Sequence, residues 1–484
     1  MGRSSRGLFP GNRRHADRPK RGKVGAPFHR TAALEGAPAP MFTERLLTAT
    51  VKAMAKRRLA LKPTDETMMP APEPGRTYML YMHVPFCQVL CPYCSFNRYP
   101  YRQEVARPYF ESLRKEMLML KDLGYDFESI YVGGGTPTIM IDELCETLDL
   151  ARENFNIKEV SSETNPNHLT KPYLDKLKGR VQRLSVGVQS FDDDLLKQMD
   201  RYEKYGSGEE IFERIGEASS YFNDFNVDMI FNFPSQTEDS LLNDIETIKA
   251  CACDQVTFSP LYVSSATTRK MSSTLGKVDH NREYTFYNII DEQLTGGADP
   301  QFDRRTLWTF NRLGSSAKPC GCSNHVEVDE YAVSYEEYPA IGSGSISHLD
   351  GCLYVNNFSI ADYNSAVSSG SMSVMGKTKL GKHDLMRYRF LLQLYDLRLD
   401  KKQFERDFDC SVERGLPAEM SYMRLNKAFA TDDENELTLT PKGRYLTLVM
   451  YRQFLSGMNN LRDQARAALT GPERELLFGD GTPE

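Results

Sequence analysis

The chain has 484 residues, of which 40% are hydrophobic and 26% charged, and its net charge is −6. This composition is typical of a folded protein with one large α/β domain and a smaller one, and the negative charge gives no general reason to expect a nucleic acid partner. The ten cysteines are too sparse for a disulfide scaffold and fit a reducing, cytoplasmic compartment. No run approaches the roughly 20 apolar residues that a membrane helix needs.

The amino-terminal region differs from the rest of the chain. Residues 1–40 are rich in Arg, Gly and Pro and show no apolar period, which predicts a disordered basic arm. The arginines leave a transit peptide as the alternative. Residues 41–75 are predicted to be a helix followed by a Pro-rich linker, because Phe42, Leu46 and Met54 recur at helical spacing.

Between residues 76 and 290, short apolar runs alternate with amphipathic helical patterns. The predicted strands cover residues 78–84, 129–135, 159–166, 183–190, 225–234 and 255–263. The predicted helices cover residues 107–124, 140–155, 170–179, 207–222 and 238–251. Strands joined in this way by helices call for a parallel sheet with right-handed crossovers. Six such units predict an α/β fold, a partial (β/α)6 TIM-like barrel rather than a complete one with eight units.

Three further regions follow the predicted barrel. Residues 291–378 are less regular and rich in Gly and Ser, and they are predicted to cap the barrel with a glycine-rich turn between flanking strands. Residues 379–460 are predicted to form a small, mostly helical, winged-helix-like carboxy-terminal domain. Residues 461–484 are predicted to be a peripheral tail.

Glycine-rich and polar motifs stand where the predicted strands end. They are the loop CQVLCPYC after the first strand and the motifs GGGTP, ETNP, GVQS and DMIFNFP at the next four. The carboxyl ends of parallel strands meet at one edge of a sheet, where α/β enzymes bind their ligands. The sequence therefore predicts an active site at the mouth of the barrel.

The loop after the first strand gathers Cys87, Cys91 and Cys94 at the spacing C-x3-C-x2-C. Three thiolates on one loop can hold a [4Fe–4S] cluster and leave one iron open for a ligand, whereas four close the cluster. Zinc is the alternative, with His83 as the candidate fourth ligand. Three buried apolar cysteines are the remaining interpretation.

The cysteine spacing, with Tyr93 just before the third cysteine, resembles the signature of radical S-adenosylmethionine (SAM) enzymes. The resemblance implies that SAM binds the open iron and that an electron from the cluster cleaves it to a 5′-deoxyadenosyl radical, which oxidises a substrate. Over about residues 76–457, the motifs YMHVPFC, GGGTPT, ETNP, SVGVQSF, VDMIFNFPSQT and LTPKGR are similar in order and spacing to one branch. That branch contains the oxygen-independent coproporphyrinogen III oxidases and the heme chaperones.

The resemblance also implies roles for single residues. Arg201 would meet the SAM carboxylate, Gln189 the ribose, and Tyr81 would be the catalytic residue near the cluster and substrate. The full set of cofactor-binding residues that it implies is Tyr93, Gly133, Gly134, Gly135, Thr136, Glu163, Gln189, Arg201 and Asp228. Glycines without a Cβ would let a ligand approach the backbone, and Asp228, a carboxylate in an apolar strand, needs hydrogen-bond donors.

The chain departs from the pattern of this branch at three places. The oxidases carry a fourth cysteine where this chain has Phe96, an ending that the heme chaperones share, and the branch carries a glycine where this chain has Asn232. The heme chaperones carry an HN-x2-YW heme motif where this chain has only DEYAVSYEEYP at residues 329–339. The chain therefore matches neither subgroup fully.

Three functions stay open from the sequence. The first is oxidative decarboxylation of a porphyrinogen-like substrate in porphyrin and heme biosynthesis, with an electron donor such as flavodoxin or ferredoxin and with Arg304 and Arg305 as candidate partners of the propionates. The second is a heme chaperone. The third is alkyl transfer by a radical SAM methyltransferase or cyclopropane-forming enzyme. A second metal centre would need the C-x-C pairs, which are Cys251, Cys253, Cys320 and Cys322.

Overall fold

The computed structural model describes residues 59–262, 264–314 and 336–478. The predicted arm at residues 1–40, most of the predicted helix that follows it, and Cys320 and Cys322 lie outside these residues. The predicted linker is largely irregular from residue 64, after the short strand β1 (Lys62–Pro63). The domain bounds given above stay predictions.

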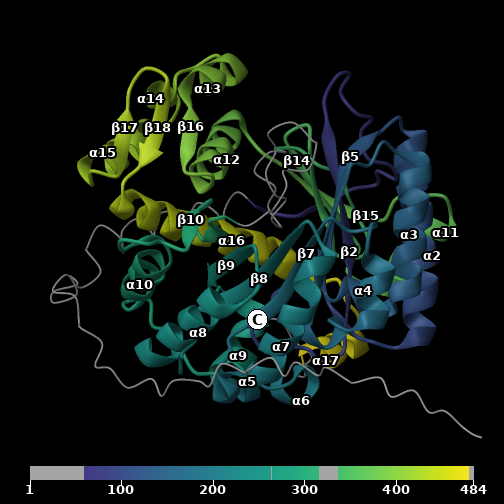
Figure 1. The fold of residues 1–484 in the computed structure, drawn as a ribbon. Coiled ribbons are helices and arrows are strands. Elements are labelled where there is room, and N and C mark those ends of the chain that lie inside the picture. The colour runs from purple at the N-terminus through teal and green to yellow at the C-terminus, as the bar shows by residue number, and fades with distance from the viewer. Residues whose placement is uncertain (1–58, 263, 315–335, 479–484) are drawn as a thin grey trace, which may run out of the picture. The chain divides into compact units, whose positions relative to one another are not determined.

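A nine-stranded sheet forms the centre of the described residues, in the order β10-β11-β9-β8-β7-β6-β5-β2-β12 (Figure 1). Its six long parallel strands are β2 (Tyr78–Val84), β5 (Phe127–Gly134), β6 (Glu159–Thr164), β7 (Arg183–Gln189), β8 (Asp224–Phe231) and β9 (Gln255–Pro260). They confirm the predicted parallel α/β sheet of six units. The short strand β12 (Ala340–Ile341) adds in parallel beside β2, and β10 (Phe302–Arg304) and β11 (Thr309–Arg312) add antiparallel strands beyond β9.

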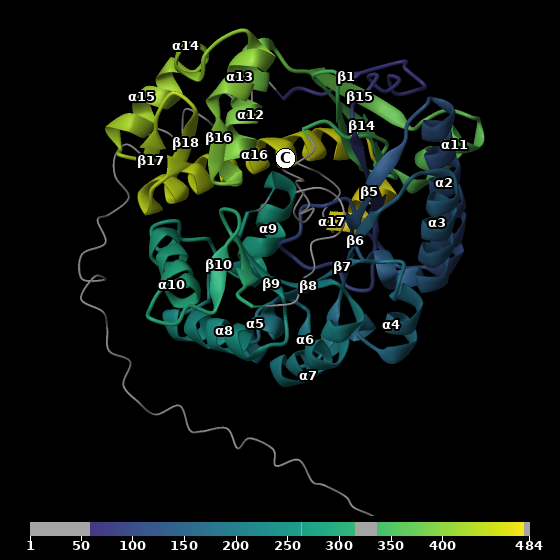
Figure 2. The ribbon, with the colours of Figure 1, turned by 45° about the horizontal axis from the view of Figure 1, so that its top comes forward.

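Helices cover the outer side of this sheet (Figure 2). The five predicted helices are present as α2 (Gln103–Asp122), α3 (Ile141–Asn154), α4 (Lys171–Leu177), α7 (Gly208–Ala218) and α8 (Glu238–Ala250). On α2 the predicted apolar stripe, which includes Tyr109 and Met117, is fully buried, as an amphipathic helix on a sheet requires. Two short helices between β7 and α7 were not predicted, α5 (Asp193–Gln198) and α6 (Tyr202–Tyr205).

Shorter elements complete the barrel and its cap. They are β3 (Phe86–Cys87), β4 (Tyr99–Pro100), α9 (Ser265–Thr274), α10 (Glu283–Thr295), α11 (Ile360–Ser368) and the 3-10 helices Pro137–Met140, Pro166–His168 and Ser219–Tyr221. The capping segment forms β13 (Ile346–Leu349), β14 (Cys352–Asn356) and β15 (Val374–Lys379), in a sheet of the order β1-β15-β14-β13. The glycine-rich turn with flanking strands is thus present.

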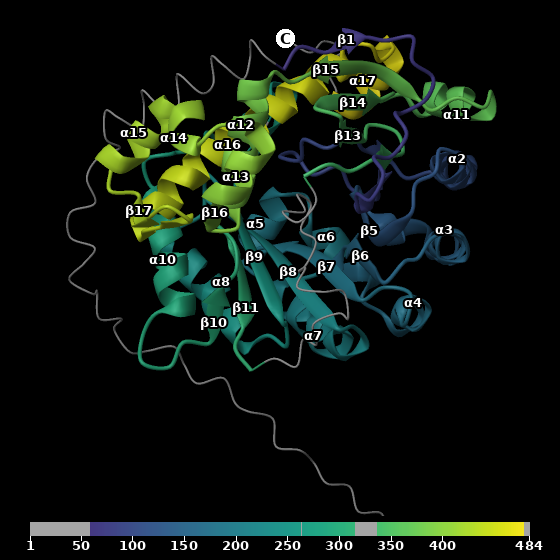
Figure 3. The same cartoon turned by 90° about the horizontal axis from the view of Figure 1, so that it is seen from above.

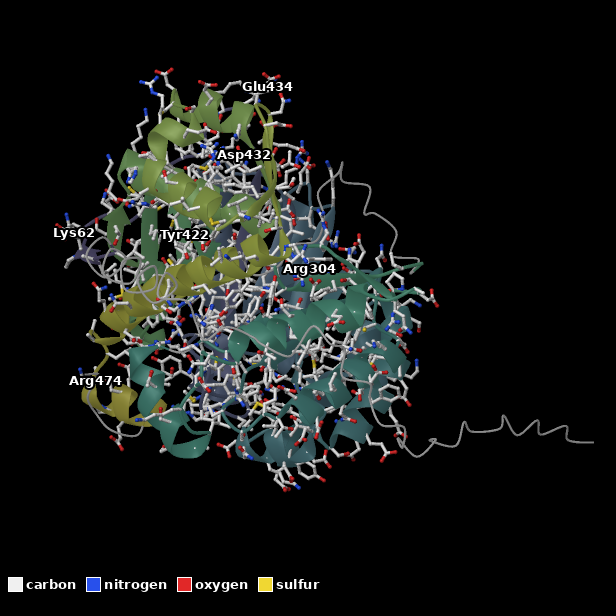
Figure 4. The ribbon with its side chains drawn as sticks, turned by 90° about the vertical axis from the view of Figure 1, so that its left-hand side faces the viewer. Lys62, Arg304, Tyr422, Asp432, Glu434 and Arg474 are labelled. Atoms are coloured by element: carbon white, nitrogen blue, oxygen red, sulfur yellow. The ribbon has the colours of Figure 1, made fainter. Side chains whose placement is uncertain are left out.

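The carboxy-terminal part is mostly helical around a three-stranded sheet of the order β16-β18-β17. Its elements are α12 (Lys382–Tyr395), β16 (Arg398–Asp400), α13 (Lys401–Phe408), α14 (Val412–Gly415), α15 (Pro417–Leu425), β17 (Phe429–Asp432), β18 (Glu436–Leu439), α16 (Pro441–Arg466) and α17 (Gly471–Phe478). Asp432 and Glu434 lie at the outer end of the β17–β18 hairpin (Figure 4).

Helix α16 has 26 residues and runs from the small sheet towards β14 and β15 (Figures 2 and 3). Its last turns bury Leu461, Arg462 and Arg466. The prediction of a peripheral tail from residue 461 is therefore wrong for this helix end, because the apolar period of the helix continues past residue 457. No helix among the described residues combines the length and apolar character needed to cross a membrane.

Glu116 on α2 fixes the glycine-rich turn from inside the protein. Its fully buried carboxylate accepts hydrogen bonds from Gly342 N (2.8 Å), the Tyr363 hydroxyl (2.7 Å) and Asn356 Nδ2 (2.9 Å). Burial raises the pKa of Glu116. Gly342 has a φ of 98°, and a Cβ there would clash with the carbonyl of His83, so only glycine fits. The turn is thus held between α2 and the end of β2.

Replacing Glu116 by alanine should lower the free energy of unfolding by about 3 kcal/mol or more, because three buried donors lose their acceptor. Urea unfolding followed by circular dichroism measures this loss. Glu111→Ala, an exposed change on the same helix, should cost less than about 0.5 kcal/mol. Equal costs for the two variants would contradict this role of Glu116.

Candidate functional site

The three cysteines line one cavity at the carboxyl edge of the parallel sheet. Cys87 and Cys91 are buried, Cys94 is half-buried, and all three are free thiols. The cavity has a volume of about 220 Å³. The other lining residues come from the cysteine loop, from the ends of β5 to β9 with the loops beside them, and from the loop between β10 and β11. They include Tyr93, Gly134, Gly135, Glu163, Asn165, Gln189, Arg201, Asp228, Thr257, Tyr262 and Trp308. This is the edge where the sequence predicts the active site.

Hydrogen bonds to its backbone hold the cysteine loop in place. Arg98 Nη2 donates to the carbonyl oxygens of Cys91 (2.7 Å) and Cys94 (2.9 Å). Tyr101 N donates to the carbonyl of Cys87 (2.9 Å), next to the short pairing of β3 with β4. A single arginine therefore joins two of the three cysteines through their main chain and also adds a positive charge to the cavity wall.

The donor set suits a cluster better than a single metal ion. Among the described residues, no three His, Cys, Asp or Glu side chains converge closely enough to hold one ion. In a cluster each thiolate binds a different iron, so the sulfurs need not converge. His83 is not free as a fourth zinc ligand, because Nδ1 lies 3.0 Å from the Tyr81 hydroxyl and Nε2 2.8 Å from the carbonyl of Asn97. Burial raises the pKa of the Cys87 thiol to about 12, so a metal must displace its proton.

Arg201 brings a buried cation to the same cavity. Its Nη1 donates to Cys91 Sγ (3.5 Å), its Nη2 donates to Asn165 Oδ1 (3.1 Å) and to the carbonyl of Gly187, and the guanidinium lies 4.3 Å above the ring of Tyr205. The Nε atom is buried and has no hydrogen-bond partner. A buried donor of this kind is costly unless a ligand meets it, which fits a site for an anion.

The three glycines at the end of β5 permit close contacts within the protein. A Cβ on Gly133 would lie 2.9 Å from Glu163 Oε1, and one on Gly135 would lie 2.6 Å from the carbonyl oxygen of Phe86. Gly134 has a φ of 108°, and its N–H donates to Glu163 Oε2 (3.1 Å). The glycine run predicts the close approach of a ligand, but the close neighbours are the protein's own groups. Gly134 and Gly135 still line the cavity.

Gln189 and Asp228 face the cavity from neighbouring strands. Gln189 has a φ of 77°, next to an irregularity in the pairing of β7 with β8. Such backbone strain is concentrated at functional sites. The carboxylate of Asp228 accepts hydrogen bonds from Ser185 Oγ (2.5 Å) and Asn226 Nδ2 (2.7 Å), which meets the expectation that a carboxylate in an apolar strand has donors.

Several predicted residues lie away from this cavity. Tyr81 is 8% exposed and lines a separate cavity of about 30 Å³ with His83 and Phe96, so the structure does not bring it into the larger cavity. Gly133 and Thr136 are not among the lining residues, although Thr136 Oγ1 donates to Cys87 Sγ (3.7 Å).

The two arginines proposed as partners of the propionates make contacts within the protein. The same holds for the first C-x-C pair, Cys251 and Cys253. Arg304 Nε donates to Asp291 Oδ1 (3.0 Å), Arg305 lies 3.9 Å from Asp396, and neither lines the cavity. Cys251 and Cys253 are buried beside Arg312, which donates to both of their carbonyls. Their proposed partners Cys320 and Cys322 lie outside the described residues.

Sequence reasoning missed Arg98, Asn165, Tyr205, Thr257 and Trp308 in the cavity wall. The sequence held a signal for Arg98, because a cation four residues after three thiolates offsets the charge of the thiolates. The signal for Asn165 was its place in the ETNP motif at a strand end. Trp308 had no local signal, because only the pairing of β11 with β9 brings its loop to this edge.

Comparison with known proteins agrees with this geometry. Residues 81–248 match the family model of the radical SAM superfamily. Over these residues the chain has a radical SAM domain. It is 25% identical to the heme chaperone HemW of Bacillus subtilis over 78% of this chain and 98% of the relative. It is also 25% identical to the oxygen-independent coproporphyrinogen III oxidase of Escherichia coli over 77% of this chain and 84% of the relative.

A solved structure shows the same fold. The coproporphyrinogen III oxidase HemN of Escherichia coli superimposes with a TM-score of 0.62 at 22% sequence identity, over 80% of this chain and 91% of that one. Radical SAM proteins bind a [4Fe–4S] cluster and SAM, and these are the cofactors of the chain. The cavity, with its three thiols and two guanidinium groups, fits them.

Asn232 shows how the protein accommodates one of its departures from the branch pattern. Its φ is 71°, a conformation that glycine adopts freely and asparagine tolerates. Asn232 Oδ1 accepts a hydrogen bond from Arg282 Nε (2.9 Å), and its Nδ2 donates to the carbonyl of Asp279 (3.2 Å). Asn232 is not among the residues that line the cavity. The substitution therefore keeps the backbone conformation without adding a side chain to the cavity wall.

Asp244 on α8 holds the segment just after Gln189. Its carboxylate accepts hydrogen bonds from Ser190 Oγ (2.9 Å) and Phe191 N (2.7 Å). Burial, with a smaller contribution from the charge of Asp192, raises the pKa of Asp244 to about 7. The folded protein thus keeps a proton on Asp244 that the unfolded chain releases near pH 4.

The contribution of Asp244 to stability should therefore be full below about pH 4 and be lost as the pH rises through about 7. Between pH 5 and pH 8 the wild type should lose about 3 kcal/mol relative to Asp244→Asn, as measured by urea unfolding at both pH values. Asp239→Asn, an exposed change on the same helix, should keep the wild-type pH dependence. An unchanged pH dependence in Asp244→Asn would refute the assignment.

Proposed function

We propose that the chain is a radical SAM enzyme that oxidises a porphyrinogen-like substrate, with loss of CO2 from propionate side chains. The observation that carries the proposal is that a single cavity is lined by the three cysteines together with Arg201 and Asp228. When bound, the cluster and SAM supply one-electron cleavage of the sulfonium and removal of a hydrogen atom from the substrate. All other roles fall to side chains of the chain itself.

Each side chain of the cavity has a role that its contacts support. Cys87, Cys91 and Cys94 would hold the cluster as thiolates. The spare Nε of Arg201 offers a donor to the carboxylate of SAM, and a guanidinium is well suited to that group. Asp228 accepts hydrogen bonds from Ser185 and Asn226, which fix its carboxylate in the cavity wall, where it would accept from the ribose hydroxyls.

Two observations support a macrocyclic substrate. The chain resembles oxygen-independent coproporphyrinogen III oxidases over most of their length. The wall of the cavity also carries Trp308 and Tyr262, whose rings offer flat surface to a pyrrole system.

A heme chaperone is the second candidate, and two observations favour it. By the resemblance given above, Phe96 is shared with the heme chaperones at the position of the oxidases' fourth cysteine, and the chain matches 98% of the length of the HemW of Bacillus subtilis. In that case the chain would bind heme in a stoichiometric amount and show no turnover with a porphyrinogen.

An anaerobic assay separates the two candidates. The reconstituted protein, incubated with coproporphyrinogen III, SAM and dithionite, should release 5′-deoxyadenosine and CO2 in several equivalents per chain. Cys87→Ala/Cys91→Ala/Cys94→Ala should lose bound iron, bound sulfide and both products. Cys410→Ala, a half-buried free cysteine outside the cavity, should keep all four. Heme binding without 5′-deoxyadenosine would support the chaperone, and wild-type protein without iron would exclude both.

A further inference from the structure

The carboxyl end of α16 reaches the segment that follows the third cysteine. Arg466 is 1% exposed, and its Nη2 donates to the carbonyl of Ser95, 371 residues earlier in the chain. Its Nη1 donates to Asp463 Oδ1 (2.6 Å). Since Ser95 directly follows Cys94, a side chain from the last turn of α16 fixes the backbone of the cysteine loop.

Two other guanidinium groups lie around the same segment. Arg462, one turn earlier on α16, lies 4.6 Å above the ring of Phe96. Arg98 donates to the carbonyls of Cys91 and Cys94. Burial lowers the pKa of Arg466, and the charges of Arg462 and Arg98 lower it further. A guanidinium nevertheless stays protonated at neutral pH.

The remaining contacts make this segment rigid. Ser95 Oγ accepts a hydrogen bond from Ser264 N (2.9 Å) at the start of α9, and Asn97 Nδ2 donates to Ser343 Oγ (3.1 Å) in the glycine-rich turn. Gln464 on α16 in turn donates to the carbonyl of Leu59 (2.9 Å). The arginines are therefore held at fixed positions beside the cysteine loop.

Gathering like charges in a buried place is costly unless an opposite charge offsets them. Asp463 offsets one of them through its bond to Arg466. Thiolates that hold a cluster would supply further negative charge beside the remaining guanidinium groups. One-electron reduction of a cluster adds one more negative charge, and a fixed cation in a medium of low dielectric favours the reduced form.

We propose that Arg466 is a positioning residue that fixes the loop after Cys94 and raises the reduction potential of the cluster held there. The inference rests on the proposed cluster at Cys87, Cys91 and Cys94. It assigns a redox role to a helix whose first turn lies at the small carboxy-terminal sheet and whose last turn lies at the cysteine loop. Asp463, which partly offsets the charge of Arg466, acts in the opposite direction.

The test measures the midpoint potential of the reconstituted full-length protein by redox titration followed by electron paramagnetic resonance. Arg466→Met removes the positive charge and should shift the midpoint to a more negative value. Asp463→Asn removes the offsetting negative charge and should shift it to a more positive value. Arg466→Lys keeps the charge and should stay closer to the wild type than Arg466→Met. Arg406→Met, an exposed change on α13, should cause no shift.

Midpoint potentials that shift with opposite sign in Arg466→Met and Asp463→Asn distinguish the electrostatic role from simple loosening of the loop. Loosening would shift the midpoint potential of both variants in the same direction. With iron content at the wild-type level, equal signs or unmoved midpoints would overturn the inference and leave the proposed function standing. If Arg466→Met does not retain a cluster, Asp463→Asn decides, and a midpoint that is unchanged or more negative overturns the inference. Wild-type protein without iron and sulfide would instead exclude the proposed cluster.

Discussion

The structure depends on holding a loop of three thiols in a fixed, buried conformation at the edge of a parallel sheet. A loop carries backbone groups that no strand or helix satisfies, so burying it requires donors from elsewhere. Arg98 and Arg466 supply them to the carbonyls of Cys91, Cys94 and Ser95. The same guanidinium groups carry the positive charge that a set of thiolates needs. One kind of side chain thus meets both the hydrogen-bonding and the electrostatic requirement.

The strand ends show a second constraint, which is backbone conformation. Gly134 at the end of β5, Gln189 at the end of β7 and Asn232 just after β8 all have positive φ. For Gln189 this conformation carries a steric cost that glycine would avoid, and Asp244 helps to offset it by binding the next two residues.

The sequence was sufficient for features that depend on local pattern. The six parallel strands and five helices follow from apolar periodicity, and the cysteine spacing with the motifs at the strand ends located most of the cavity wall. Long-range contacts carry no such signal. Arg466 meets Ser95 from 371 residues away, and Trp308 reaches the cavity only through an antiparallel strand added beyond β9. Tyr81 was misplaced because alternation along a strand does not tell which of two neighbouring cavities a side chain enters.

The charges of the cavity bear on how a substrate could be held. Among the described lining residues the cations are Arg98 and Arg201, and both make hydrogen bonds to the cysteine loop. A substrate carboxylate would therefore meet no cation on this part of the wall that is independent of the cysteine loop. Binding would then depend more on contact with aromatic surface than on charge pairing, and such contact suits a flat macrocycle whether it is oxidised or only carried. The side chains around the cluster thus do not separate the two candidate functions, whereas turnover of SAM with a porphyrinogen does.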